Sequence, residues 1–276
     1  MQDKDYLQLA IDQANKSVFE GGFPAGAVVV KDGKVIGEGI SIGNILHDPT
    51  SHGETQCVRN ACKNIQSSDL SGATLYASME TCAMCLNSCM WAGISRIVFA
   101  LSKDKLSNLY YGGNYTSADI NTFFLKPMDI VQVKELEESS MKVVTVWEEL
   151  QKLPQVIRDV GFDFSWSEEK VWDLNYPTET MDINDLTWHF TIPFHWDNGG
   201  VYNLTSQEII DNPEKYKDEY DRTMNADLSH PIDIMENKGK WLILDGLHRL
   251  MKSKILGKSD VQVRKIPRSE IVNIIK

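Results

Sequence analysis

Two short runs of residues combine the side chains that bind and use a metal ion. His52, Gly53 and Glu54 form a His-x-Glu run, and Cys82 and Cys85 form a Cys-x-x-Cys run. One imidazole and two thiolates would give Zn2+ three protein ligands and leave the fourth tetrahedral position open to water. Zinc lowers the pKa of water in such a position, so hydroxide forms near neutral pH. Glu54 lies close enough to move protons without binding the metal, which predicts a hydrolytic enzyme with Glu54 as the catalytic proton shuttle.

Two structural interpretations of these residues compete with the catalytic one. Ser51 and Glu54 have the spacing of a capping box, in which the glutamate would only cap a helix. Cys89 follows Cys85 by one helical turn, and a fourth thiolate would close the zinc site and make it structural. The catalytic interpretation is favoured because a closed site would leave Glu54 without a use. We expect the cysteines outside the Cys-x-x-Cys run to be small buried apolar residues.

The apolar pattern predicts the elements that position this site. Apolar residues at helical spacing indicate a helix near residues 3–20. Residues 27–30 and 34–39 are predicted strands of a hairpin that turns at Asp32 and Gly33. The elements that follow are a helix from Ser51, a strand over 73–79, a helix over 83–93 and a strand over 96–101. This alternation predicts an α/β fold in which the metal ligands begin two helices, whose N-terminal dipoles favour thiolate.

Composition limits the class of protein. The 276 residues suffice for one large domain or two modest ones, and 28 Lys and Arg against 39 Asp and Glu give a net charge of −11. This acidic balance argues against general binding to nucleic acid or to an anionic membrane. No apolar run approaches the length of a membrane span, and the polar N-terminus lacks the pattern of a secretory signal, so we expect a cytoplasmic protein. An odd number of cysteines favours metal binding over disulfides.

The pattern changes in the second half of the chain. We place the boundary near residue 155, which gives an α/β domain with the metal-binding runs over 1–155 and a smaller α+β domain over 156–276. In the second domain, a helical stretch is broken at Pro213, a strand leads into a helix over 240–258, and another strand follows. The histidines at 189, 195 and 230 lie among aromatic residues or before proline, so we expect them to be structural.

The first half resembles the cytidine deaminase-like superfamily, in particular its free-base and nucleoside deaminases. The resemblance rests on the two metal-binding runs, the segment GAVVVKDGKVIGEG and Asp48-Pro49-Thr50, and it spans about residues 5–110. It implies a three-layer α/β/α fold and hydrolytic deamination of a small amino-purine or amino-pyrimidine, guanine- or cytosine-like. It also implies that Asn44 hydrogen-bonds the substrate ring, that Trp91 stacks on the base, and that the protein is a homodimer. Asn44 as a turn residue and Trp91 as a packing residue remain alternatives.

Residues 242–258 resemble the ParB/sulfiredoxin-like fold, which has a G-x-H-R-type motif between a strand and a helix. Gly246 permits a tight turn, while His248, Arg249 and the helix N-terminus offer the donors and charge that suit a phosphate. The resemblance therefore implies a nucleotide or phosphate site at these three residues. Leu247 stands where sulfiredoxins have their catalytic cysteine, which excludes that redox chemistry. The alternative is a domain that only packs against the deaminase.

Three functions follow from these patterns. The favoured one is zinc-dependent deamination of a free nucleobase or nucleoside. The second is deamination within a nucleic acid of the transfer-RNA type, bound through a cluster of basic residues near the C-terminus: Lys252, Lys254, Lys258, Arg264, Lys265 and Arg268. The third is a non-catalytic nucleotide-binding module with a structural zinc. The acidic charge favours the first over the second.

Overall fold

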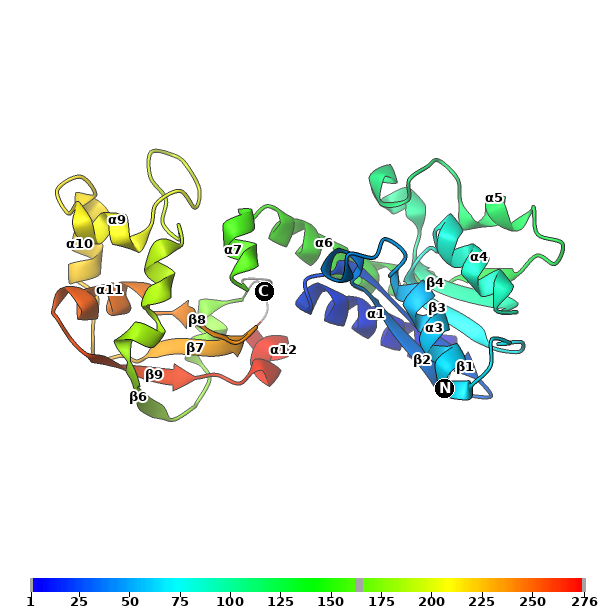
Figure 1. Ribbon diagram of the computed structural model, residues 1–276, viewed down its shortest axis with the longest axis horizontal. Coiled ribbons are helices and arrows are strands. Elements are labelled where there is room, and N and C mark those ends of the chain that lie inside the picture. The colour runs from blue at the N-terminus through cyan, green and yellow to red at the C-terminus, as the bar shows by residue number, and fades with distance from the viewer. Residues whose placement is uncertain (1, 162–165, 275–276) are drawn as a thin grey trace. The chain divides into compact units, whose positions relative to one another are not determined.

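The chain forms two compact units, Met1–Glu149 (unit 1) and Leu150–Lys276 (unit 2). The computed structural model in Figure 1 describes residues 2–161 and 166–274. The sequence placed the domain boundary near residue 155, a few residues beyond the division in the structure. Within the described ranges, no helix combines the length and the apolar character needed to cross a membrane.

Unit 1 is built on a five-stranded sheet with the order β2-β1-β3-β4-β5. Its strands are β1 (Phe23–Lys31), β2 (Lys34–Ser41), β3 (Thr74–Met79), β4 (Arg96–Leu101) and β5 (Asp129–Gln132). The first three strands pair antiparallel, and β3, β4 and β5 pair in parallel. The predicted hairpin is confirmed: Asp32 and Gly33 have φ angles of 50° and 73°, as a two-residue turn between twisted strands requires.

Helices cover both faces of this sheet. They are α1 (Asp3–Phe19), α2 (Gly43–Leu46), α3 (Gly53–Ile65), α4 (Ala83–Trp91), α5 (Ser117–Asn121) and α6 (Glu137–Gln151), with 3-10 turns at Lys103–Lys105, Asn108–Tyr110 and Lys134–Leu136. Val29 and Leu75 point to one face and share a core with Cys57 of α3. Tyr76, on the opposite face, contacts Tyr6 of α1 with ring centroids 5.2 Å apart. The sheet is therefore buried between two helical layers, which confirms the expected mixed α/β fold.

Unit 2 is an α+β unit on a four-stranded sheet with the order β6-β9-β7-β8. Its strands are β6 (Thr178–Asp182), β7 (Ile232–Asn237), β8 (Lys240–Asp245) and β9 (Asp260–Lys265). Its helices are α7 (Gln155–Asp159), α8 (Glu168–Trp172), α9 (Ser206–Asp211), α10 (Lys217–Met224), α11 (Leu247–Ile255) and α12 (Ile271–Ile274), with 3-10 turns at Ile183–Asp185, Thr187–Thr191 and Arg268–Glu270. The β7–β9 pair is parallel and the other two pairs are antiparallel.

Candidate metal centre

The His-x-Glu and Cys-x-x-Cys runs meet at the N-termini of α3 and α4, which pack against each other in unit 1 (Figure 1). His52 and Cys82 are the N-cap residues of these helices, and Cys85 lies in the first turn of α4. The Nδ1 atom of His52 lies 3.6 Å from the Sγ atoms of both Cys82 and Cys85, which are 3.5 Å apart. Ligands at zinc bond lengths on a tetrahedron are separated by about 3.5–3.8 Å. The three side chains therefore fit one zinc ion, with one corner free of protein ligand.

Two glycines let the histidine-bearing helix approach the sheet. A Cβ atom on Gly39 of β2 would lie 2.0 Å from the carbonyl oxygen of Gly53, the first residue of α3. A Cβ on Gly53 would in turn lie 2.9 Å from the carbonyl oxygen of Ala25 in β1. Side chains at these positions would push α3 outward, so the glycines fix the place of His52.

Glu54 is the buried acid of the site. It lies in the first turn of α3, and only 4% of its surface is exposed. Burial, and after it the charge of Cys82, raises the pKa of the Glu54 carboxyl to about 7. A carboxyl that titrates near neutral pH can accept a proton and also return it. The capping-box interpretation is wrong: His52 is the N-cap, no side chain caps α3, and the Ser51 hydroxyl accepts a hydrogen bond from Gln56 Nε2 at 2.8 Å.

The cysteines outside the ligand set are core residues. Cys89 and Cys57 are fully buried in the core between the sheet and α3, and burial raises the pKa of both thiols. Among the described residues, the ligand group at this place consists of His52, Cys82 and Cys85. The structure thus offers no support for a site closed by Cys89.

The segment after β4 is hydrogen-bonded to the turn that carries the cysteine ligands. Tyr111 donates its hydroxyl proton to the carbonyl oxygen of Glu80 at 2.9 Å. The hydroxyl of Tyr115 accepts a hydrogen bond from the backbone N–H of Ala83 at 3.3 Å and donates to the Tyr111 carbonyl at 2.7 Å. Glu80 and Ala83, which flank Thr81 and Cys82, are therefore both hydrogen-bonded to tyrosines of a loop that is distant in sequence.

The Glu80 carboxylate completes this connection. One of its oxygens accepts hydrogen bonds from the N–H and hydroxyl of Ser117 at 2.7 and 2.8 Å, and the other accepts from the N–H of Lys103 at 3.0 Å. On the helix side, the hydroxyl of Thr55 lies 3.3 Å from Cys85 Sγ. The sequence analysis identified none of these residues as part of the site. For those that follow β4, the tyrosine-rich run 110–115 was the available signal.

The two residues predicted to bind the base are exposed near the ends of short helices. Asn44 lies in α2, and its side-chain amide donates a hydrogen bond to the carbonyl of Gly21 at 2.8 Å. Trp91 is the last residue of α4, and 83% of its surface is exposed, so it does not pack on a helix face. Their roles toward a substrate stay predictions.

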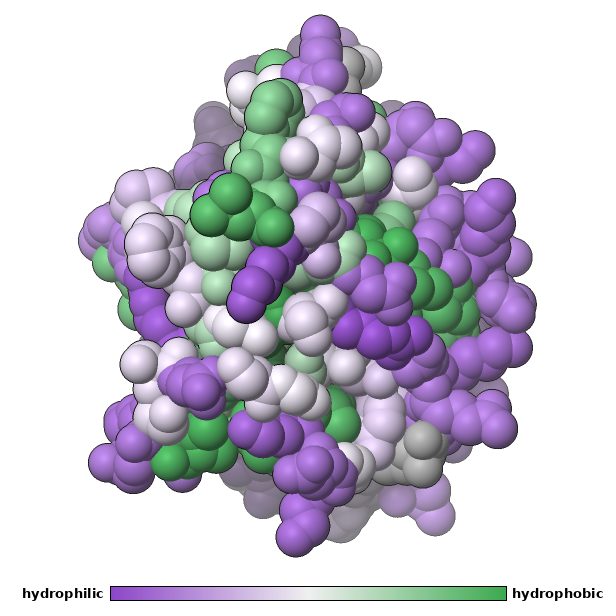
Figure 2. Space-filling view, turned by 90° about the vertical axis from the view of Figure 1, so that its right-hand side faces the viewer, coloured by the Kyte–Doolittle hydropathy of each residue, from purple (hydrophilic) through white to green (hydrophobic). Residues whose placement is uncertain are grey.

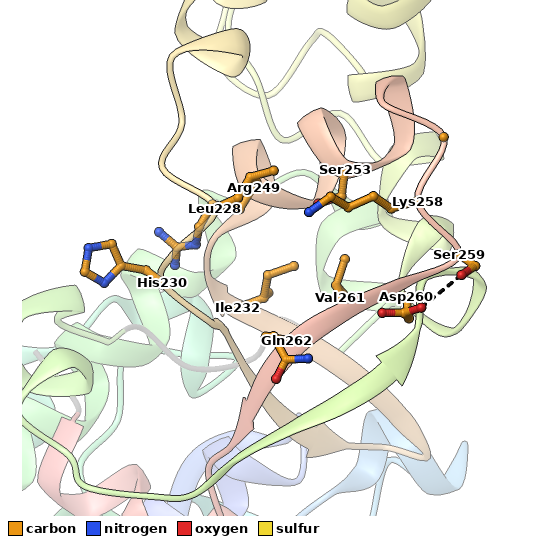
Figure 3. Close-up of a pocket in the computed structure, with 11 residues that line it drawn as sticks. Leu228, His230, Ile232, Arg249, Ser253, Lys258, Ser259, Asp260, Val261 and Gln262 are labelled. Atoms are coloured by element: carbon orange, nitrogen blue, oxygen red, sulfur yellow. Dashed lines mark hydrogen bonds between the residues drawn. The ribbon is translucent and has the colours of Figure 1, made fainter.

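The residues predicted to bind phosphate in unit 2 have different surroundings in the structure. Gly246 has φ +107°, which confirms the tight turn before α11. Arg249 donates a hydrogen bond to Asp245 at 3.0 Å, has a buried Nε atom without a partner, and lines a cavity of about 430 Å³ (Figure 3). His248 instead has its Nδ1 atom 3.1 Å from Thr223 Oγ1, and burial lowers its pKa to about 4.

The other histidines of unit 2 differ from one another. His189 is buried, its Nδ1 atom lies 2.8 Å from the Leu186 carbonyl, and its Nε2 atom accepts a hydrogen bond from the N–H of Ile243 at 3.1 Å. This is the structural role expected for it. His230 is largely exposed and lies 3.7 Å from Asp227. His195 is buried and lies with Glu219 and His248 in a second group of metal-binding side chains.

Comparison with known proteins agrees with the geometry of unit 1. A sequence profile of the cytidine and deoxycytidylate deaminase zinc-binding region matches residues 1–101. A tRNA-specific adenosine deaminase of Haemophilus influenzae is 38% identical over 104 residues, which are 37% of this chain and 60% of that protein. The guanine deaminase of Bacillus subtilis is 39% identical over 101 residues, which are 36% of this chain and 65% of that protein.

A further relative is matched over most of its length. The tRNA-specific adenosine deaminase of Buchnera aphidicola is 34% identical over 139 residues, which are 50% of this chain and 85% of that protein. The ligand geometry and the matched family both specify Zn2+ at His52, Cys82 and Cys85. The chain belongs to the cytidine and deoxycytidylate deaminase family, whose zinc-binding region it carries in its first 101 residues.

Proposed function

We propose that the protein is a zinc-dependent hydrolytic deaminase of a free nucleobase or nucleoside with a guanine- or cytosine-like amino group. The observation that carries this proposal is the buried carboxyl of Glu54 beside three metal ligands that leave one corner free. A site with only a structural purpose would be closed by a fourth protein ligand. A structural site would also have no use for a buried carboxyl that lies beside the metal ligands without being one of them.

The residues of the site would have separate roles in the reaction. When bound, zinc supplies a Lewis acid that makes hydroxide available near neutral pH. Glu54 accepts a proton from the attacking water as the oxygen–carbon bond forms, and passes it to the ring nitrogen. It then accepts the remaining proton of the added oxygen and delivers it to the amino group, so that the carbon–nitrogen bond breaks, a carbonyl forms and ammonia leaves. Asn44 would hydrogen-bond the ring, and Trp91 would stack on it.

Charge supports a small substrate over a nucleic acid. Unit 1 contains 12 Lys and Arg and 18 Asp and Glu, a net charge of −6. A polyanion is bound mainly through lysine and arginine contacts to phosphates, which such a surface disfavours. Deamination of transfer RNA is the second candidate, because two of the relatives described above are tRNA-specific adenosine deaminases.

Ammonia release separates these candidates. The zinc-loaded protein would be incubated with guanine, cytosine, adenine, their nucleosides and a bulk transfer-RNA preparation. We expect ammonia from a base or nucleoside at a rate that changes little with salt. Ammonia from transfer RNA alone, with a rate that falls steeply as salt is added, would contradict the proposal and favour the second candidate. A zinc-loaded, folded protein without activity would favour the non-catalytic module.

For unit 2 we propose a ParB/sulfiredoxin-like fold with a phosphate site on Arg249. Strand β8, the turn at Gly246 and helix α11 follow one another as this resemblance implies. Figure 3 shows Arg249 and Ser253 of α11 facing Ile232 and Val261 across the cavity, which Lys258 also lines. A nucleotide that binds there should raise the melting temperature of the wild type but not of Arg249→Ala. No shift in either protein would contradict this site.

We also propose a homodimer. Unit 1 exposes large apolar side chains at the end of α4, in the turn Asn108–Tyr110 and just after α5: Trp91, Leu109, Phe123 and Leu125. Figure 2, which faces this side of Figure 1, shows hydrophobic groups among hydrophilic ones on the surface. Contiguous exposed apolar surface is typical of a protein interface. Sedimentation analysis should give twice the chain mass of 31.3 kDa, and a Leu125→Glu variant should sediment as a monomer.

A further inference from the structure

Unit 2 contains a second group of side chains with the chemistry of a metal site. His195 lies in the segment before α9, Glu219 lies in α10, and His248 lies in the first turn of α11. One potential ligand atom from each lies within 4.8 Å of the other two. The three residues are distant in sequence, so only the fold brings them together.

Two of the three separations between these atoms are close to those around a tetrahedral ion. Glu219 Oε2 lies 3.4 Å from His195 Nδ1 and 3.8 Å from His248 Nε2. Nitrogen and oxygen ligands at zinc bond lengths are about 3.4 Å apart on a tetrahedron. The ligand atoms of the unit 1 zinc site are 3.5–3.6 Å apart, between these two separations. An octahedral magnesium ion would place its neighbouring ligands about 2.9 Å apart, which is shorter than either separation.

In a neutral His248 ring, the hydrogen bond to Thr223 places the single ring proton on Nδ1 and leaves Nε2 without one. The Thr223 hydroxyl donates to the carbonyl oxygen of Glu219 at 2.9 Å, so it accepts from His248 Nδ1 at 3.1 Å. With the proton on Nδ1, the lone pair of Nε2 faces the Glu219 carboxylate. A lone pair and a carboxylate oxygen repel each other at this separation unless a cation lies between them.

The surroundings of His195 and Glu219 also suit a bound cation. His195 is only 7% exposed, and its Nε2 atom bonds to the hydroxyl of the fully buried Ser206 at 2.9 Å. Each imidazole therefore has its outer nitrogen held by a hydroxyl, the arrangement that orients metal-binding histidines in proteins. Glu219 Oε2 is buried and forms no well-aligned hydrogen bond; its nearest nitrogen is His195 Nδ1, at 3.4 Å. A buried carboxylate oxygen without a good hydrogen bond is costly, and a cation bound between it and the imidazoles would remove that cost.

We propose that His195, Glu219 and His248 bind a second divalent transition-metal ion, of which Zn2+ fits best, in unit 2. Imidazole nitrogens select zinc-like ions over magnesium or calcium, which prefer oxygen ligands. Three protein ligands leave a fourth position, and His248 also lines a cavity of about 500 Å³ together with Tyr202 and Arg222. Solvent or a small ligand can reach His248 from that cavity.

Metal content tests the proposal on the full-length chain. After chelation and reconstitution, we expect about two zinc ions per wild-type chain by elemental analysis. Cys82→Ser/Cys85→Ser should retain one, and adding Glu219→Gln should remove it. His230→Gln, which changes an exposed histidine of the same unit, is the matched control and should leave the zinc content unchanged. A single zinc per wild-type chain would overturn the proposal.

Cobalt distinguishes the two sites even where the cysteine variant does not fold. In the wild type, a first equivalent should give intense thiolate-to-cobalt absorption, and a second should add only weak visible bands from nitrogen and oxygen ligands. Thr223→Val should lower the affinity for the second equivalent by about 10–100-fold, because it removes the acceptor for His248 Nδ1. Unchanged affinity in both Thr223→Val and Glu219→Gln would overturn the assignment of these residues.

Discussion

The hydroxyl of Tyr111 donates a hydrogen bond to the backbone carbonyl of Glu80, 2.9 Å away and two residues before the zinc ligand Cys82. Tyr115 bonds in turn to Ala83, on the other side of the ligand. The zinc-binding turn is thus positioned by a loop that follows β4 as well as by its own helix. Residues that hold metal ligands in this way contribute to metal affinity and to stability.

Glu80→Gln should lower the free energy of unfolding. The amide group of glutamine would face one of the N–H donors that now bond to the carboxylate, those of Ser117 and Lys103. A buried donor without an acceptor costs about 1–3 kcal/mol. Urea unfolding of the zinc-loaded protein measures the loss. Glu138→Gln, at an exposed position of α6, is the control, and equal stability of the two variants would contradict the buried role of Glu80.

Gly39→Ala should weaken zinc binding. The new methyl group would lie 2.0 Å from the Gly53 carbonyl oxygen, so α3 and His52 would have to move. Overpacking of this kind costs about 1–3 kcal/mol in stability. Gly72→Ala is the comparison, because nothing lies within 4 Å of its Cβ and only its positive φ is strained. Zinc titration should show weaker binding for Gly39→Ala alone, and equal affinities would count against the close approach.

Arg264→Met should destabilise unit 2 far more than Lys265→Met. Arg264 Nε lies 2.6 Å from the carboxylate of Asp233, which is 2% exposed. Removing one partner of a buried pair leaves the other charge uncompensated and costs about 3–5 kcal/mol. Lys265 pairs with Glu179 at the surface, so Lys265→Met should cost about 1 kcal/mol or less. Denaturant unfolding measures the free energy of unfolding of both variants. Similar losses for Arg264→Met and Lys265→Met would contradict the buried role of Arg264.

His189 should make unit 2 less stable in mild acid. Burial lowers its pKa from 6.5 to about 4, while the unfolded chain keeps the ordinary value. Between these values the unfolded state binds more protons, so stability is full above pH 6.5 and falls as the pH drops toward 4. From about pH 7 to about pH 5, the wild type should lose about 2 kcal/mol more than His189→Gln. Parallel losses in the two proteins would show that His189 does not take up this proton.

The metal ligands could be predicted because their chemistry has a fixed local spacing. A histidine two residues before a glutamate, and two cysteines three residues apart, are recognisable without any knowledge of the fold. The Asp32-Gly33 turn and the helix of residues 3–19 were predicted for the same reason, since each depends on neighbours in the chain. The burial of Glu54 was not predicted and is known from the structure.

Other features depend on contacts between distant residues and left no local pattern. Strand β6 buries only Met181, so the alternation that marks a strand is absent at this edge of the sheet. Tyr111 donates its hydrogen bond to the backbone carbonyl of Glu80, a group that every residue provides. His195 was expected to be structural, because its partners Glu219 and His248 lie far along the chain. Three-dimensional structure was needed to find both sets.

The most direct test of the account compares ammonia release by the wild type and Glu54→Gln, each with the unit 1 zinc site fully loaded. Glutamine keeps the shape of the side chain but cannot carry the proton. The account predicts a rate lower by about 100- to 10,000-fold, with zinc content unchanged. A Glu54→Gln protein that releases ammonia at the wild-type rate would contradict it.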